Sequence, residues 1–311
     1  MPGPYAHITL LHELMQPDNL ENIFSPTSGI ITVLPKYFSY CVLGAVSPDY
    51  PNLASGDCTA SAWADAMHTS RVCEMIACGI EQVRNVKGSA RNKQLAWLLG
   101  YCSHVVADVT IHPVVQAKVG VYAENQRQHR ICEMNQDSYI FRRMNLGEIG
   151  ESDHYAESVW QCGDHRDRTQ LNRDIVNLWQ NMFADVHPEL FFTHLPDPSA
   201  WHREFVAMAE RCKVGSLQLF PLAGVIAAKM ELAYPAYDTV DSHFTEEQII
   251  PSETPFTLHY DEIFDHAVAN VASVWSQVEQ AVYADTDQLH LFGDWNLDTG
   301  RDEHGALVFW E

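Results

Sequence analysis

Basic residues are scarce in this sequence of 311 residues. It holds 19 lysines and arginines against 41 aspartates and glutamates, which gives a formal net charge of -22. The imbalance is greatest between Glu231 and Glu311, where 17 acidic residues accompany a single basic one, Arg301. Because such a surface repels phosphate backbones at long range, we do not expect a nucleic acid as a partner.

The sequence also lacks a recognisable export signal. Its N-terminus has no basic segment followed by a sustained apolar one, so no signal peptide is expected. No apolar stretch approaches the roughly 20 residues that a membrane-spanning helix needs, so no membrane span is predicted. The eight cysteines include no CxxC pair, which favours reduced thiols over a disulfide framework. Together these absences predict a cytoplasmic protein.

Strand-like alternation is rare, and helical periodicity takes its place. Apolar residues recur at helical spacing over 30–43, 63–83, 94–119 and 124–144, and again in segments between 170 and 284. The sequence therefore predicts a mostly α-helical fold. We expect a metal-binding helical core over residues 1–145. Residues 146–311 would add a C-terminal elaboration of helices and loops that packs on this core as one unit.

The helix predicted over 94–119 carries polar residues on an apolar background. In the stretch HVVADVTIH, His104, Asp108 and His112 follow one another at intervals of four, so they share one helical face. Between them lie the apolar residues Val105, Val106, Ala107, Val109 and Ile111, which predict that this face is buried, where polar groups need partners. Pro113 follows directly, and a proline disfavours helical geometry at the residue before it. We therefore expect the helix to end or to kink at His112.

Several other residues in the first half have side chains that bind metal ions. Asp49 stands in the turn GAVSPDYP, and His129 and Glu133 are again four residues apart, in HRICE. The full candidate set has five histidines and three carboxylates: His7, Asp49, His68, His104, Asp108, His112, His129 and Glu133. Imidazole and carboxylate together suit zinc, and also manganese or iron.

Eight ligands are too many for one tetrahedral ion. They suffice for two or three ions if one carboxylate bridges, and Asp108, at the centre of its triplet, is the natural bridge. Ions held close together can activate a shared water and stabilise the leaving group of a phosphoester. Each histidine alone also fits a hydrogen-bonded core residue, and a pair four apart can simply support a helix. The triplet combined with the HxxxE pair is what favours metal binding.

The order of these motifs resembles the zinc-dependent phospholipase C family, whose relatives include the S1/P1 nucleases. The matching stretches span roughly residues 5–145 and read YAHI, GAVSPDYP, WADAMH, AWLLGYCSHVVADVTIHPVV and HRICEMNQD. The resemblance implies a multi-helix bundle of the type that this family shares with P1 nuclease, and a three-zinc cluster between its helices.

Carried over residue by residue, the resemblance implies which residues hold each ion. Asp49, His68, His104 and Asp108 would hold one ion, His112, His129 and Glu133 a second, and His7 with the bridging Asp108 a third. It also implies that Asp49 is the general base and that Asp108 acts together with a metal-bound water.

Two departures from the family pattern leave a two-metal centre open. Met1-Pro2 stands where the secreted members have a tryptophan that completes the third site. The interval from Asp108 to His112 is also shorter than in those members.

The sequence thus predicts a zinc-dependent hydrolase of phospholipase C type that cleaves a phosphoester or phosphodiester of a small molecule or a lipid. One alternative is an intracellular metalloenzyme that uses the same cluster, with iron, manganese or zinc, for a different reaction. Another is a non-catalytic binding protein stabilised by its metal. Closed coordination around every ion would favour that last reading.

Overall fold

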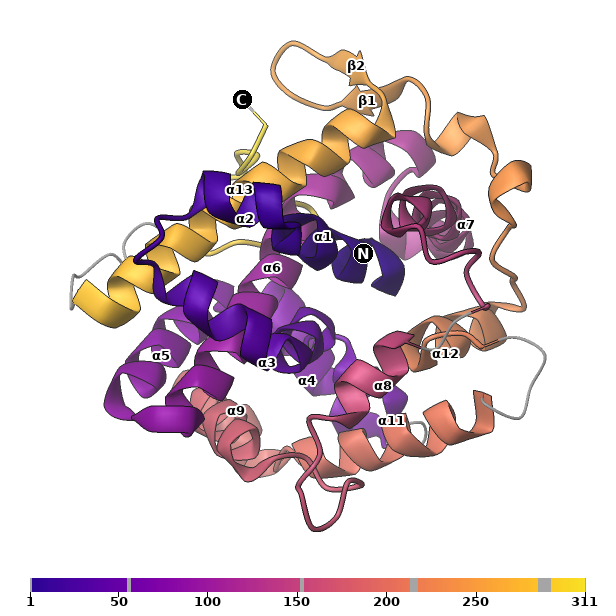
Figure 1. Ribbon diagram of the computed structural model, residues 1–311. Helices are drawn as coiled ribbons and strands as arrows, with labels where there is room; N and C mark the ends of the chain where they lie inside the picture. Colours follow the sequence, from indigo (N-terminus) through magenta and orange to yellow (C-terminus); the bar gives the residue numbers. More distant parts are fainter. Residues whose placement is uncertain (1, 55–56, 152–153, 213–217, 285–291, 311) are drawn as a thin grey trace.

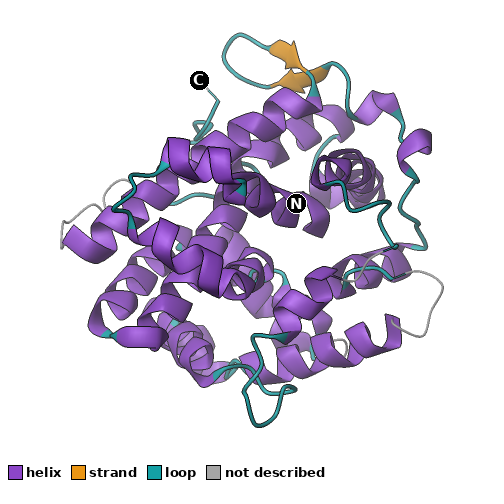
Figure 2. Cartoon of the chain, in the orientation of Figure 1, coloured by secondary structure: helices purple, strands orange, loops and turns teal. Residues whose placement is uncertain are grey.

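A computed structural model describes residues 2–54, 57–151, 154–212, 218–284 and 292–310. Over these residues the chain is mostly helical, with one small two-stranded sheet at its periphery (Figure 1, Figure 2). The prediction of a mostly α-helical fold is confirmed.

The α-helices are α1 (Pro4–Met15), α2 (Pro17–Ile23), α3 (Gly29–Val46), α4 (Cys58–Thr69), α5 (Val72–Asn85), α6 (Gly88–Val119), α7 (Tyr122–Phe141), α8 (His154–Trp160), α9 (Arg173–Val186), α10 (Pro188–Thr193), α11 (Pro198–Cys212), α12 (Pro221–Met230) and α13 (Tyr260–Ala284). Short 3-10 helices are η1 (Tyr50–Leu53), η2 (Arg142–Met144), η3 (Tyr237–Thr239) and η4 (Ser242–Phe244). Strands β1 (Gln248–Ile250) and β2 (Phe256–Leu258) pair antiparallel, with Gln248 opposite Leu258.

Helix α6 forms the centre of the molecule (Figure 1). It packs against α3, α13, α5, α7 and α9, and every residue from Gln94 to Val115 is buried. Because neighbours surround this helix, no face of its middle part reaches solvent. The polar triplet predicted on it is therefore buried together with its apolar residues.

Helices α3 and α6 cross at unusually short range because a glycine from each lies at the contact. A Cβ on Gly44 would collide with the carbonyl oxygen of Trp97, and one on Gly100 would collide with that of Cys41. Glycine at both positions lets the two backbones touch. The crossing brings the end of α3 against the turn of α6 that carries His104.

Two expectations about helix ends are wrong. The helix expected over 63–83 is divided, since α4 ends at Thr69 and α5 begins at Val72 after Arg71 adopts a left-handed conformation with φ of 53°. Conversely, α6 neither ends nor kinks before Pro113 but continues to Val119. Packing around α6 outweighs the local preference of the residue that precedes a proline.

The expectation that no apolar stretch is long enough to span a membrane is also wrong, if length and composition are the only criteria. Among the described residues, α3 and α6 both meet those two criteria. In α6, however, the whole apolar window is buried inside the protein, and in α3 half of it is. The core helix of a soluble protein meets the same criteria, so these helices are only weak evidence for a span.

The segment 292–310 returns to α6 after the long helix α13. Two bridges, Asn296 with Arg301 and Arg301 with Leu307, shape it into a compact turn. The indole Nε1 of Trp310 donates a hydrogen bond to the carbonyl of Thr110 at 2.6 Å. The turn thereby covers the part of α6 that follows Asp108.

Candidate metal centre

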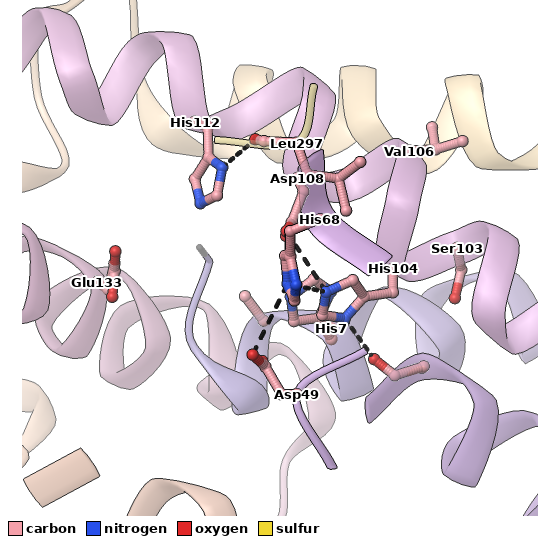
Figure 3. Close-up of polar contacts among 12 residues, drawn as sticks. His7, Asp49, His68, Ser103, His104, Val106, Asp108, His112, Glu133 and Leu297 are labelled. Carbon is pink, nitrogen blue, oxygen red and sulfur yellow. Dashed lines mark hydrogen bonds and ion pairs between the residues drawn. The ribbon is translucent and has the colours of Figure 1, made fainter. Parts of the chain in front are cut away.

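Five of the eight predicted ligands meet at one place inside the helical core (Figure 3). His7 comes from α1, Asp49 from the turn after α3, His68 from the end of α4, and His104 and Asp108 from α6. All five are buried, with exposed fractions of 6% or less. Because they come from separate segments, only tertiary packing brings them together.

Asp108 contacts three histidines of this cluster. Its Oδ1 lies 3.3 Å from Nε2 of His7, and its Oδ2 lies 3.4 Å from Nε2 of His104. The same Oδ2 is 3.8 Å from Nε2 of His68, which in turn lies 3.7 Å from Oδ1 of Asp49. The ligand atoms of His7, His104 and Asp108 all lie within 4.8 Å of one another. The same is true of Asp49, His68 and His104, so the two groups share one histidine.

Main-chain carbonyls set the tautomers of two of these rings. Nδ1 of His104 donates to the carbonyl of Ala45 at 2.8 Å, and Nδ1 of His68 donates to that of Ala64 at 2.7 Å. A carbonyl only accepts, so in each neutral ring the proton is on Nδ1. Both Nε2 atoms then carry lone pairs, and they face each other at 3.4 Å.

The cluster presents lone pairs without donors to meet them. In the described part of the chain, neither ring nitrogen of His7 makes a hydrogen bond, nor does either oxygen of Asp108 or the Oδ1 of Asp49. Buried polar atoms rarely stay unpartnered in folded proteins. Imidazole nitrogens and carboxylate oxygens are ligands of zinc. The donor set therefore fits divalent cations.

The pKa values of the cluster residues also indicate a site for a cation. Burial lowers the pKa of His7, and the neighbouring His104 lowers it further. Burial also works against a charge on His104, but the Asp108 carboxylate outweighs it and raises the pKa of that ring. Burial alone would raise the pKa of Asp108, yet His104 and His7 hold it far below its usual range. Asp108 is therefore a buried anion that needs a proton or a metal ion beside it.

The other three predicted ligands, His112, His129 and Glu133, do not join either group of ligand atoms among the residues described. Nδ1 of His112 donates to the carbonyl of Leu297, and Nε2 of His129 donates to that of Gly120 at 2.6 Å. The second nitrogen of each ring is buried and makes no hydrogen bond in the described structure. Each neutral ring thus keeps a lone pair on its second nitrogen, and both residues belong to the wall of the cavity described below.

Glu133 is paired with a buried cation, Arg130, that is not among the eight predicted ligands. Its Oε2 lies 2.7 Å from a guanidinium nitrogen of Arg130, and both side chains are buried. Arg130 also donates to the hydroxyl of Tyr122 at 3.1 Å. Arg130 could have been recognised from its position inside the HRICE motif, between the predicted ligands His129 and Glu133. Leu297 could not have been recognised from the sequence, because it contacts His112 through its main-chain carbonyl, which every residue type has.

A cavity of about 290 Å³ lies beside the cluster. Part of its wall consists of predicted ligands, namely Asp49, His68, His112 and His129. Arg130 and Lys229 contribute positive charge to the wall. Another part is apolar and comes from α12, namely Leu222, Val225 and Ile226. A small molecule that enters this cavity therefore contacts Asp49 and His68 of the five-residue cluster and also His112 and His129.

These features define a helical protein with buried histidine and carboxylate groups that could bind metal ions next to a cavity. Residues 6–189 match the family model described as zinc dependent phospholipase C, and the chain belongs to this family. The predicted resemblance is confirmed. The matched region contains all eight predicted ligands and extends past residue 145. Comparisons with curated proteins and with solved structures return no match.

Proposed function

We propose that this protein is a phosphodiesterase of phospholipase C type that works with two or three zinc ions. The observation that carries the proposal is the cluster of five buried side chains whose lone pairs face one another without hydrogen-bond donors. Membership of a zinc-dependent phospholipase family supports both the metal and the class of reaction.

The proposed ligand roles follow the two groups of atoms. Asp49, His68 and His104 would hold one ion, and His7 with Asp108 another, with Asp108 as the bridge. A third position would use the remaining lone pairs of His112 and His129 together with Glu133. When bound, the ions supply Lewis acidity toward a phosphoryl oxygen and lower the pKa of a water.

The residues of the chain supply the remaining steps. Asp49 lies in the cavity wall, and its Oδ1 makes no hydrogen bond within the described residues. We assign to it the role of general base that takes a proton from the attacking water. Asp108, an anion at ordinary pH, orients the rings of His7 and His104. Arg130 in the same wall binds phosphate oxygens.

The cavity supports a phosphoester with an apolar group as the substrate. Its volume of about 290 Å³ suits a headgroup and a phosphate rather than an entire lipid. The apolar wall from α12 lies where the non-polar part of such a substrate would start. The net charge of -22 opposes binding of a nucleic acid. A cytoplasmic location stays a prediction.

The test combines metal analysis with turnover. Protein purified without added metal should contain zinc, and a chromogenic phosphodiester should be cleaved. Chelation should abolish cleavage, and added zinc should restore it. Asp49→Asn should lower kcat at least about a hundredfold, while Asp18→Asn, on the exposed part of α2, should not change it. Turnover that persists after verified removal of all metal contradicts the proposal, and iron or manganese in place of zinc favours the alternative metalloenzyme.

A further inference from the structure

The segment 292–310 reaches the metal centre although it lies outside the region that matches the family model. The amide N–H of Leu297 donates to the carbonyl of His68 at 2.9 Å. Its carbonyl accepts a hydrogen bond from Nδ1 of His112. One main-chain unit is therefore bonded to two proposed ligands, which belong to α4 and α6.

The bond to Leu297 decides which nitrogen of His112 can bind a metal ion. Since a carbonyl only accepts, the proton of the neutral ring is on Nδ1 and the lone pair is on Nε2. That Nε2 is buried, makes no hydrogen bond in the described structure and belongs to a residue of the cavity wall. Figure 3 shows the ring with Nδ1 toward Leu297 and its other nitrogen turned away.

The turn that carries Leu297 packs closely against α6 because it contains a glycine, Gly300, at the contact. Gly300 has a φ of +65°, and its amide closes the turn by donating to the carbonyl of Asn296 at 2.9 Å. A Cβ at this position would collide with the ring of Pro113 and the carbonyl of Val109. The absence of a side chain thus allows the turn to lie directly beside the residue that follows His112.

We propose that segment 292–310 is a structural component of the metal centre and that Leu297 is a positioning residue. It joins the helices of His68 and His112 and holds Nε2 of His112 in the orientation that binds an ion. This inference rests on the proposed function in so far as the ion is the zinc of that site. Loss of such a hydrogen bond to a ligand typically costs 10- to 100-fold in metal affinity.

Two glycines of the segment form a matched pair for the test. Gly300→Ala should displace the turn, because its new Cβ meets Pro113 and Val109. Gly305→Ala is the control, since Gly305 also has a positive φ, of +82°, but nothing lies within 4 Å of its Cβ position. Zinc affinity measured by chelator competition should fall at least about tenfold for one equivalent in Gly300→Ala. It should stay at the wild-type value in Gly305→Ala.

A second readout reports the tautomer directly and needs no metal. Long-range proton–nitrogen correlation spectra of protein with ¹⁵N-labelled histidine show which ring nitrogen carries the proton, and His112→Gln assigns the signal. His112 should be protonated on Nδ1 in the wild type and in Gly305→Ala, and mixed in Gly300→Ala. His104 and His129 should keep their tautomers, because Ala45 and Gly120 lie outside the segment.

Each outcome decides the inference. An unchanged His112 tautomer and unchanged zinc affinity in Gly300→Ala overturn it, as does an equal change at His104 and His129, which would indicate general unfolding. Should Gly300→Ala not fold, Trp310→Phe removes the bond to Thr110 and should shift the same signal by a smaller amount. A wild-type protein that binds no zinc refutes the proposed function, whereas the tautomer spectra still decide the role of Leu297.

Discussion

The Nε2 atoms of His68 and His104 face each other at 3.4 Å, although neither can donate a hydrogen bond to the other in its neutral form. Their Nδ1 protons are already bound to the carbonyls of Ala64 and Ala45. Two lone pairs at this distance repel unless a proton or a metal ion lies beside both. The same pair faces the carboxylate of Asp108, which adds negative charge. This arrangement is the clearest reason to expect a cation.

Asp108→Ala should remove more than one equivalent of zinc, because we place this carboxylate between two ions. Elemental analysis of the purified variant, with Asp18→Ala on the exposed part of α2 as the control, measures the loss. A variant that retains every ion would show that Asp108 does not bridge.

Zinc affinity should weaken as the pH falls from 8 to 6. The pKa of His104 is raised above its ordinary value of about 6.5, so a proton competes for this ring already near neutral pH. Asp108 does not compete, since its pKa lies far below this range. For each proton that zinc must displace from a protonated ligand, the Kd for zinc should rise about tenfold with each unit by which the pH falls. Competition with a chelator at three pH values measures it, and a Kd that stays constant between pH 8 and 6 would contradict the proposed role of His104.

Gly100→Ala should destabilise the protein by about 1–3 kcal/mol, because its new Cβ meets the carbonyl of Cys41 at the crossing of α3 and α6. It should also weaken zinc binding, since His104 lies one turn further along α6. Gly224→Ala in α12 is the control. Its Cβ meets only an ordinary contact at 3.9 Å, so alanine should stabilise the helix by up to about 1 kcal/mol. Chemical denaturation measures the stability of both variants. Equal changes in their free energy of unfolding would argue against the backbone contact at Gly100.

Arg130→Gln should lower the free energy of unfolding of the metal-free protein by about 3 kcal/mol. The buried carboxylate of Glu133 loses its guanidinium partner at 2.7 Å. The loss should be smaller in the zinc-loaded protein if Glu133 binds an ion, because the ion then balances its charge. Denaturation curves with and without zinc test this. An equal loss in both states would contradict a role of Glu133 as a zinc ligand.

Much of the fold could be predicted because local rules decide it. The 3.6-residue periodicity of α6 and the four-residue intervals of His104, Asp108 and His112 follow from helix geometry alone. Features that depend on neighbours could not be predicted. Packing keeps α6 helical through Pro113, and α4 and α5 are separate helices because Arg71 turns the chain between them.

The sequence by itself determined the helical character of the chain, its acidic charge and the chemical types and order of the eight candidate ligands. Only the tertiary structure decided that five of them share one buried cluster while His112, His129 and Glu133 belong to neither group of ligand atoms among the described residues. It also decided which ring nitrogens carry a lone pair, because the other nitrogens of His68, His104, His112 and His129 donate to the main-chain carbonyls of Ala64, Ala45, Leu297 and Gly120. Residue types reveal donors and ligands, whereas main-chain atoms are alike at every position and gain a role only through folding.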